Sequence, residues 1–259
     1  MIVAFANQKG GVGKTTTTLN LGSYLAALGK KTCLIDLDPQ ANLTSGLGYS
    51  AQSLTENDSL AGSVYDLLTS QKEFNEVLFQ TRSDNLTLIP SSIDLAGAEI
   101  ELVNMVSRET ILRDALEKAH HVFDFVLIDC PPSLGLLTIN ALTAADRVCI
   151  PVQTEYFALE GLGQLLNTVK LVKSKLNSNL KIGGVIMTMF DARTNLAKDV
   201  ISEVHKVFGD RVFETIIPRN IRLSEAPSHG KSIVEYDSNS SGADAYKKLA
   251  EEFITSFSK

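Results

Sequence analysis

The sequence predicts an α/β fold in which a mostly parallel, twisted sheet carries helices on both faces. Three observations support this prediction. Short apolar runs alternate with longer segments of helical pattern, a glycine-rich loop joins the first run to the first helix, and acidic residues lie at the ends of two runs. Continuous apolar strands separated by helices are typical of a parallel sheet that is buried on both sides.

The predicted strands are short runs of apolar and β-branched residues. The first, IVAFA, contains no polar position, as expected for a central strand. The second and fourth, TCLIDL and FDFVLID, each carry an acid at or beside their last position. The full series occupies residues 2–6, 32–37, 86–91, 123–129, 147–152, 182–190 and 212–218.

Helical patterns lie between most of these runs. The first begins near Lys14, repeats leucine at helical spacing and ends near Gly29, a residue type common just after a helix. The remaining patterns lie around residues 94–118, 135–145, 155–176, 195–208 and 242–257. The polar, turn-rich segment at 45–62 predicts a surface excursion.

Length and composition fit one soluble domain. The chain has 259 residues, 44% hydrophobic and 21% charged, and single α/β domains commonly reach about 250 residues. No internal repeat or low-complexity linker divides it. We therefore predict one domain over residues 1–259, with a C-terminal helix at about 240–258 that packs on the core.

Charge and cysteine usage exclude some classes of protein. The net charge of −6 argues against a wholly basic nucleic-acid binder, although residues 170–231 hold 11 basic and 6 acidic side chains. The three cysteines form no C-x-x-C pair, so neither a zinc site nor a disulfide framework is indicated. The chain shows no charged leader and no apolar run of membrane-spanning length, so we expect a cytoplasmic protein.

The segment NQKGGVGKTT lies between the first predicted strand and the first predicted helix. Gly10, Gly11 and Gly13 leave space for backbone N–H groups to converge on phosphate oxygens, and the helix that follows adds its N-terminal dipole. Lys14 can reach the β- and γ-phosphates, and the Thr15 hydroxyl can ligate Mg²⁺. The strand–loop–helix order therefore predicts a P-loop NTPase fold.

One position departs from the common pattern G-x-x-x-x-G-K-[ST], because its first glycine would fall at Gln8, and Lys9 follows directly. The run KGGVGKT, from Lys9 to Thr15, resembles the deviant Walker A motif of the ParA/MinD family, K-G-G-x-G-K-[ST]. The resemblance covers residues 2 to about 236 and implies a single-domain ATPase that uses ATP and Mg²⁺. The neighbouring Thr16 can donate a further hydrogen bond to phosphate.

The resemblance also implies a role for the second lysine of the loop. In the family, the signature lysine reaches across an ATP-bound homodimer to the partner's phosphates, so Lys9 joins Lys14 as a nucleotide-binding and catalytic candidate. Triphosphate charges left unpaired at a subunit boundary would cost several kcal/mol each. A cation supplied by the opposite subunit would therefore make dimerisation depend on ATP.

Three carboxylates follow predicted strands. Asp129 ends the fourth strand beside the phosphate loop, where an acid can hold Mg²⁺ through water. Asp36 and Asp38 lie two residues apart and so point to the same side. The resemblance gives Asp38 the positioning or activation of the attacking water, and Asp36 would more naturally support Mg²⁺. Alternatively, both acids cap the helix that follows near Asn42.

Residues 216–233, IIPRNIRLSEAPSHGKSI, resemble the corresponding segment of the chromosomal Soj/ParA subgroup. In that subgroup the P-R-N turn lies against adenine, which implies apolar contact from Pro218 and amide hydrogen bonds from Asn220. The subgroup also binds DNA without sequence preference through basic side chains, and phosphate contacts need only suitably placed cations. The matching positions are Arg193 and Arg222, with Arg219 and Lys231 as weaker candidates, although each could be an ordinary solvated charge.

These features resemble a partitioning ATPase of the ParA/Soj type, which implies an ATP-dependent dimer on nucleoid DNA and a ParB-like partner. No glutamine and arginine pair of the fast GTPase type is evident, and an arginine finger is worth about 10³–10⁵ in rate, so we expect slow hydrolysis. The cargo could be a chromosome or a plasmid.

Two alternatives remain open. A MinD-like membrane-associated ATPase would end in a basic amphipathic helix, whereas DAYKKLAEEFITSFSK balances acids and bases, which favours core packing and no stable membrane association. A metabolic relative, such as a nitrogenase-like iron protein or a ligase-type synthetase, is the other; the cysteines do not match the cluster positions of the iron protein.

Overall fold

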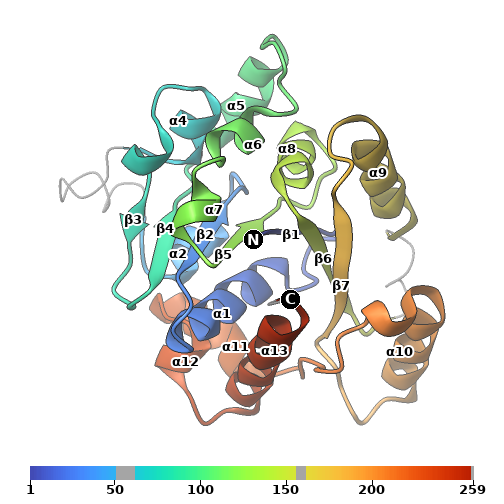
Figure 1. Cartoon of the computed structure of the whole chain (residues 1–259). Helices are drawn as coiled ribbons and strands as arrows, with labels where there is room; N and C mark the ends of the chain where they lie inside the picture. The colour runs from blue at the N-terminus through green and yellow to red at the C-terminus, as the bar shows by residue number, and fades with distance from the viewer. Residues whose placement is uncertain (51–61, 156–161, 258–259) are drawn as a thin grey trace.

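The computed structural model describes residues 1–50, 62–155 and 162–257, and within these ranges it forms a sheet between two layers of helices (Figure 1). The sheet has seven strands in the order β3-β4-β2-β5-β1-β6-β7. All neighbouring strands are parallel except the edge pair β3 and β4. The strands are β1 Ile2–Phe5, β2 Thr32–Asp36, β3 Phe79–Gln80, β4 Leu86–Ile89, β5 Phe125–Asp129, β6 Arg147–Gln153 and β7 Lys181–Thr188.

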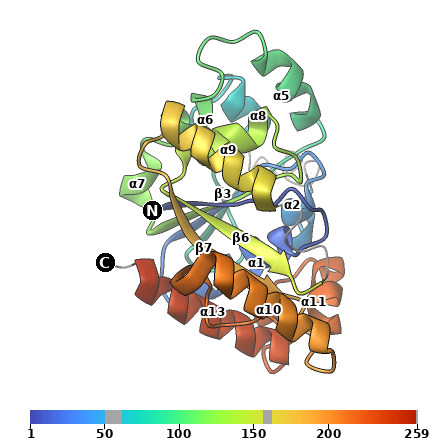
Figure 2. The same cartoon turned by 90° about the vertical axis from the view of Figure 1, so that its right-hand side faces the viewer.

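The helices alternate with the strands as a parallel sheet requires. Three of the longest are α1, α10 and α13, and α13 packs against α1 on one face of the sheet (Figures 1 and 2). The α-helices are α1 Lys14–Ala27, α2 Asn42–Gly46, α4 Val64–Leu68, α5 Leu95–Leu102, α6 Ile111–Ala115, α7 Ala119–Val122, α8 Leu136–Ala144, α9 Leu162–Lys175, α10 Asn195–Phe208, α11 Ile221–Glu225, α12 Ile233–Tyr236 and α13 Ser241–Phe257. Short 3₁₀ helices lie at η1 Phe74–Glu76, η3 Gly209–Arg211 and η4 Ala226–His229.

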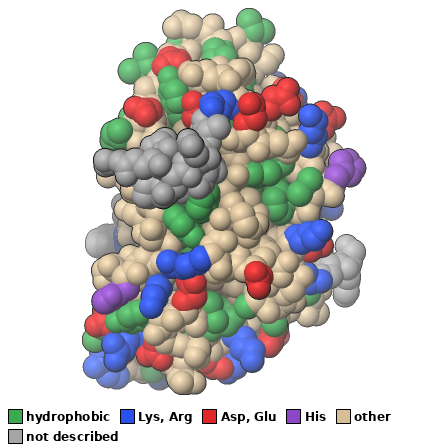
Figure 3. Space-filling view, turned by 90° about the vertical axis from the view of Figure 1, so that its left-hand side faces the viewer, with side chains coloured by type: hydrophobic (Ala, Val, Ile, Leu, Met, Phe, Trp, Pro, Cys, Tyr) green, Lys and Arg blue, Asp and Glu red, His purple; other side chains and the backbone are tan. Residues whose placement is uncertain are grey.

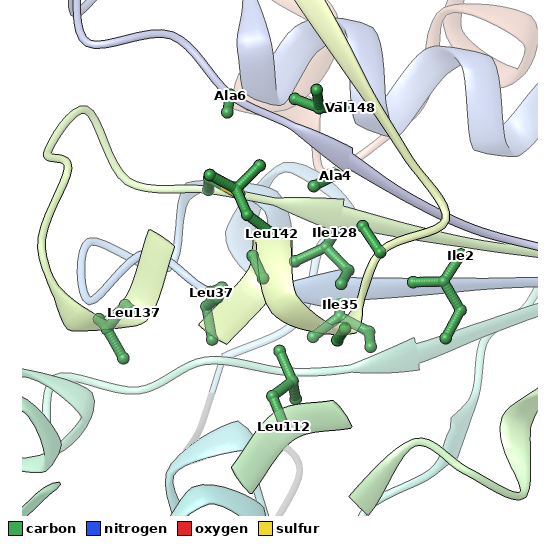
Figure 4. Packing of buried hydrophobic residues seen from close by; sticks show 14 of the residues in the cluster. Ile2, Ala4, Ala6, Ile35, Leu37, Leu112, Ile128, Leu137, Leu142 and Val148 are labelled. Carbon is green, nitrogen blue, oxygen red and sulfur yellow. The ribbon is translucent and has the colours of Figure 1, made fainter. Parts of the chain in front are cut away.

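The side chains of each strand point alternately to the two faces of the sheet and form a hydrophobic core on each face. On one side, residues such as Ile2, Ala4 and Ile128 pack beneath α4 to α9, as Figure 4 shows around Leu112 and Leu142. On the other side, strand residues including Val3, Phe5 and Leu127 pack beneath α1 and α13. The predicted α/β fold with helices on both faces is therefore confirmed.

Residues 212–218, predicted as a strand, do not form one. Two isolated bridges, at Val212 and Pro218, and single hydrogen bonds from the N–H groups of Phe213 and Ile217 join this segment to β7 and its extension, without a continuous ladder. Between them, the N–H groups of Glu214 and Thr215 donate to the carboxylate of Glu252 at 2.7 and 3.0 Å, so they are not available to β7. Pro218 has no N–H to continue a ladder.

The helical pattern around 94–118 also differs from the prediction, because the segment divides into α5 and α6, with α7 following at 119–122. Ser107 adopts a left-handed backbone (φ 56°), which ends any continuous helix there. The side chain of Asn140 then accepts from Leu112 N at 3.1 Å and donates to Arg108 O at 2.7 Å. A tertiary hydrogen-bond pair thus replaces the helical bonds between α5 and α6.

Several smaller elements were not predicted, namely β3, α4, α11 and α12, whereas α2 is the helix near Asn42 of the capping alternative. Part of the predicted excursion at 45–62 and the start of the predicted helix at 155–176 lie outside the described residues. No helix among the described residues is long and apolar enough to cross a membrane. The carboxyl ends of β1, β2 and β5 meet at one edge of the sheet, and the candidate site lies there.

Candidate functional site

The glycine-rich loop leaves β1 and enters α1 with an exposed backbone. Gly11 and Gly13 adopt left-handed conformations (φ 72° and 84°), which side chains rarely tolerate. A Cβ at Gly10 or Gly11 would meet no atom within 4 Å, so open space lies above the loop. The N-cap residue Gly13 offers no capping side chain and α1 has no acid in its first turn. The first N–H groups of α1 therefore remain available to an anion.

A cavity of about 610 Å³ lies over this loop. Its floor includes Lys14, Thr15 and Thr16, and Asp38 lines another part of it. The Lys14 side chain is buried, and its Nζ donates to Lys9 O at 3.3 Å. Burial lowers the pKa of Lys14, while the charges of Asp129, Cys130 and Asp38 oppose that shift. The Lys14 ammonium thus has few hydrogen-bond partners and lies at the base of a cavity, which favours the binding of a polyanionic ligand.

Lys9 stands apart from this cavity. Its backbone N–H donates to Asn7 Oδ1 at 3.0 Å, which fixes the start of the loop. The Lys9 side chain is half-buried and is not among the residues that line the cavity. Within the described part of the chain, its ammonium makes no ion pair. The Lys14 ammonium thus contacts the backbone of Lys9, whereas the Lys9 side chain does not line the cavity.

Asp129, at the end of β5, is fully buried, and neither carboxylate oxygen has a hydrogen-bond partner among the described residues. Burial, and next the charge of Asp36, raise the pKa of Asp129 to about 8, although Thr15 and Lys14 oppose the shift. Buried oxygens without donors favour a cation. Carboxylate and hydroxyl oxygens, completed by phosphate and water, are the ligands that Mg²⁺ prefers. The donor set of Asp129 and Thr15 therefore fits magnesium.

Asp36 has a different environment, although it is equally buried. Its Oδ2 accepts from Thr44 N at 2.8 Å and from Thr44 Oγ1 at 2.7 Å, and its Oδ1 accepts from Asp38 N at 3.3 Å. Burial raises the pKa of Asp36 to about 6, against these hydrogen bonds. The two carboxylate oxygens of Asp36 thus accept hydrogen bonds from α2 and from the backbone of Asp38. This is the role that the helix-capping alternative gives to Asp36. A magnesium role for Asp36 stays a prediction.

Asp38 faces the cavity at the start of the segment that leads to α2. Its Oδ1 accepts from Gln40 N at 2.9 Å, and its side chain lines the cavity. Ser91, just after β4, donates from its hydroxyl to Asp38 O at 2.8 Å and from its N–H to Thr44 Oγ1 at 3.0 Å. Residues at the ends of two strands, Asp36 of β2 and Ser91 after β4, therefore fix the backbone of Asp38.

A second cavity of about 210 Å³ adjoins the first and shares Gly13, Thr16 and Met189 with it. Pro218 and Asn220 line this smaller cavity, as predicted for a base-binding pocket, although no base is present to test their contacts. The Asn220 amide already donates to Ser241 Oγ at 2.8 Å and accepts from Arg222 N at 2.8 Å. Any contact of this amide with a base would therefore compete with these two bonds.

The predicted DNA-binding arginines each face an acid of the same chain. Arg193 forms a two-point ion pair with Asp191, at 2.9 and 2.6 Å. Arg222 pairs with Glu225 at 2.9 Å, and Arg219 pairs with Glu155 at 3.2 Å. Lys231 is exposed and makes no ion pair with the described residues. The structure therefore gives these four side chains no shared pocket.

Sequence reasoning missed part of the cavity wall. Polar residues around α2 and the η4 turn line the cavity on either side of the loop: Gln40, Asn42, Ser45, Gly46, Pro227 and Ser228. The dipeptide Asp38-Pro39 and the turn residues after it signalled an irregular segment, and APSH lies inside the segment that carried the family resemblance. Neither pattern states that the two segments would meet.

Comparison with known proteins agrees with this geometry. A family model described as an AAA domain matches residues 1–182. The sporulation initiation inhibitor protein Soj of Bacillus subtilis (strain 168) is 57% identical over 251 residues, 97% of each chain. The chromosome-partitioning ATPase Soj of Treponema pallidum (strain Nichols) is 56% identical over 252 residues, 97% of this chain and 96% of that protein.

Solved structures of similar fold include proteins with bound nucleotide and magnesium. Cobyrinic acid a,c-diamide synthase from Mycobacterium smegmatis, with bound ATP analog and magnesium, superposes with a TM-score of 0.82 at 40% identity, over 96% of this chain and 92% of that one. The identity to the Soj proteins is higher and extends over nearly the whole length of both chains. The chain therefore belongs to the ParA/Soj family of chromosome-partitioning ATPases.

Proposed function

We propose that the protein is a magnesium-dependent, slow ATPase that dimerises on ATP, and that only the dimer binds DNA firmly. The observation that carries this proposal is the position of the two lysine side chains: that of Lys14 lines the cavity, and that of Lys9 does not and makes no ion pair among the described residues. A single bound triphosphate uses the first lysine. The second is available to another subunit.

In the bound state, the glycine loop and the start of α1 would receive the phosphates, with Lys14 beside them. The oxygens of Asp129 and Thr15 fit Mg²⁺. When bound, the ion would neutralise part of the negative charge of the phosphates. Asp38, on the cavity wall, would orient the attacking water through its carboxylate. Pro218 and Asn220 would contact the base in the smaller cavity.

The charges of the nucleotide explain why dimerisation would follow binding. Two ATP molecules facing each other across a subunit boundary place several negative charges where water is excluded. Because buried charges cost several kcal/mol each when unpaired, the boundary is stable only if each subunit supplies a cation to the other. Lys9 is the available cation of the loop.

DNA binding would then follow from pairing, since each subunit contributes few phosphate contacts. If one subunit neutralises about three phosphates and a dimer about six, the slope of log K against log salt changes from about −2.7 to −5.4. Basic side chains on the face shown in Figure 3 are interspersed with acidic ones, which fits weak individual contacts. Arg193, Arg222, Arg219 and Lys231 remain the proposed phosphate contacts, and DNA would have to displace the internal ion pairs of all three arginines.

The partner, location and membrane behaviour are part of the same proposal. A ParB-like protein would accelerate hydrolysis, and the protein would be cytoplasmic and nucleoid-associated. The apolar stripe of the last helix is buried: Ala245, Leu249, Phe253 and Phe257 belong to the core beneath α13. An amphipathic membrane anchor needs such a stripe free, so this burial favours no stable membrane association.

Lys9→Ala tests the proposal directly. Sedimentation with a non-hydrolysable ATP analogue and magnesium should give a dimer for the unmodified protein and a monomer for the variant. Nucleotide affinity should be close to unchanged, because the Lys9 side chain does not line the cavity. Lys30→Ala, a surface lysine just after α1, is the control. A monomeric unmodified protein, or a variant that still dimerises, would show that Lys9 does not join the subunits.

A further inference from the structure

The nucleotide cavity has two facing walls that are far apart in the sequence. One wall is the Asp38 segment with α2, which contributes Gln40, Asn42 and Ser45. The other is η4, which contributes Pro227 and Ser228 and directly continues α11. The first wall carries the proposed water-positioning acid. The second lies between Arg222 and Lys231, two proposed DNA contacts.

The two walls meet outside the cavity, at two glycines that face each other. Gly48 follows α2 and Gly230 follows η4, and both adopt left-handed conformations (φ 83° and 61°). A Cβ added to Gly230 would lie 2.5 Å from Gly48 Cα, and one added to Gly48 would lie 2.8 Å from Gly230 O. Backbone therefore packs directly on backbone, and no side chain could be accommodated between them.

Arg82 joins the same two segments. Its backbone N–H donates to the hydroxyl of Tyr49, next to Gly48, at 2.9 Å. Its guanidinium donates to Gly230 O and pairs with Glu235 at 3.1 Å. Glu235 in turn accepts from the N–H and hydroxyl of Ser232, at 2.9 and 2.8 Å. The contact thus continues into α12.

The α2 wall is also fixed to the catalytic side. Thr44 binds Asp36, and Ser91 binds both Thr44 and the carbonyl of Asp38, so α2 and the Asp38 backbone share one set of hydrogen bonds. A displacement of the Asp38 segment would therefore displace α2. Gly48, just after α2, is the residue that contacts Gly230, on the side of the molecule that also carries α11 (Figure 2).

We propose that the Gly48–Gly230 contact, with Arg82 across it, links the two walls so that nucleotide-driven movement of the Asp38 segment reaches the segment that carries Arg222 and Lys231. This inference rests on the proposed function and names how one site regulates the other. Gly48 and Gly230 act as positioning residues, since neither lines a nucleotide cavity. A methyl group at Gly230 would force the walls apart by about 1 Å, the difference between 2.5 Å and an ordinary contact of about 3.5 Å.

The variants Gly230→Ala and Gly48→Ala test this link, and Gly29→Ala is a matched control. Gly29 also has a left-handed backbone (φ 81°), but a Cβ there would meet nothing within 4 Å, so the control carries the backbone penalty without the contact. Arg82→Ala loosens the link without adding a group and serves where a glycine variant does not fold. Apo-state melting temperatures identify variants that are folded.

The first measurement is amide hydrogen exchange of residues 231–236, none of which lines either cavity. In the unmodified protein and in Gly29→Ala, an ATP analogue with magnesium should slow exchange there. In the link variants this response should disappear, while residues 42–48 still respond. Unchanged exchange at 231–236 in the unmodified protein, or a full response in Gly230→Ala, would overturn the inference.

The second measurement is the ratio of DNA affinities in the ATP-analogue and ADP states. Coupling between two sites is typically worth about 5–150-fold, so the ratio should fall at least about fivefold in the link variants and stay constant in Gly29→Ala. A ratio near one in the unmodified protein would refute the proposed DNA switch, and the exchange measurement would still test the link. A ratio preserved in Gly230→Ala would refute the link alone.

Discussion

Asp129→Asn should remove a pH dependence from the stability of the nucleotide-free protein. The Asp129 carboxylate is fully buried without a hydrogen-bond partner among the described residues, and its pKa in the folded protein is about 8, against 3.8 for an ordinary aspartate. Above pH 4 the unfolded chain has released a proton that the folded protein still holds. Stability therefore falls as pH rises, until the folded carboxyl ionises near pH 8.

The size of the effect follows from that difference. Each pH unit within this range costs about 1.4 kcal/mol of unfolding free energy for one such group. Asp36, with a pKa of about 6, contributes in the same direction at lower pH. We therefore choose the window from pH 6.5 to 8, where Asp129 should account for about 2 kcal/mol, or about 4–8 °C in melting temperature for a chain of this size.

Thermal melts at several pH values in this window, with no nucleotide or metal, measure the effect. Groups remote from Asp129 titrate alike in the two proteins, so the difference between their slopes reports Asp129 together with Lys14, whose pKa the Asp129 charge raises. Asp191→Asn is the control, because Arg193 lowers the pKa of Asp191 to about 2 and its ionisation is complete throughout the window. Equal slopes for Asp129→Asn and the unmodified protein would refute the conclusion that this carboxylate is buried without a partner.

The nucleotide-site and DNA predictions can be checked with three further variants. Lys14→Ala should lower affinity for an ATP analogue by about 10- to 150-fold, since a charge-assisted contact of about 1.5–3 kcal/mol is lost; calorimetry with unchanged affinity would contradict the loop assignment. Asp38→Ala should bind ATP and dimerise but lose turnover in a phosphate-release assay, and turnover at the unmodified rate would remove its catalytic role. Arg222→Glu should weaken retention on DNA while ATP-dependent dimerisation persists; unaltered retention would move the contact to Arg193 or elsewhere.

The central strands and the phosphate loop could be predicted because local sequence determines them. IVAFA can only be a strand buried on both faces, and GGVGK needs glycines wherever the backbone turns left-handed. Both signals are complete within ten residues. The glycines of the loop and the acid at the end of FDFVLID therefore identified the site before any tertiary contact was known.

The failures have the opposite character, since they depend on partners distant in sequence. The apolar run at 212–218 has strand-like composition, but the carboxylate of Glu252 on α13 accepts hydrogen bonds from the N–H groups of Glu214 and Thr215. Asn140 on α8 likewise divides the segment around 94–118. The meeting of Gly48 with Gly230 has no sequence signal either, because nothing in SGLGY or SHGKS specifies the other segment.

The two acids at the carboxyl ends of β2 and β5 were both predicted to support Mg²⁺ from the sequence, but the fold gives them different hydrogen-bond partners. Asp36 and Asp129 are register partners on adjacent parallel strands, and burial raises the pKa of both, while the charge of Asp36 raises that of Asp129 further. Thr44 donates twice to Asp36 and satisfies it, whereas no donor among the described residues satisfies Asp129. A divalent cation that binds here would be attracted by both charges but could replace a missing partner only at Asp129. Since the donors of Asp36 come from α2, the neighbouring acid fixes the segment that carries Asp38. The structure thus gives Asp36 partners within the chain, whereas Asp129, the proposed magnesium ligand, has none among the described residues.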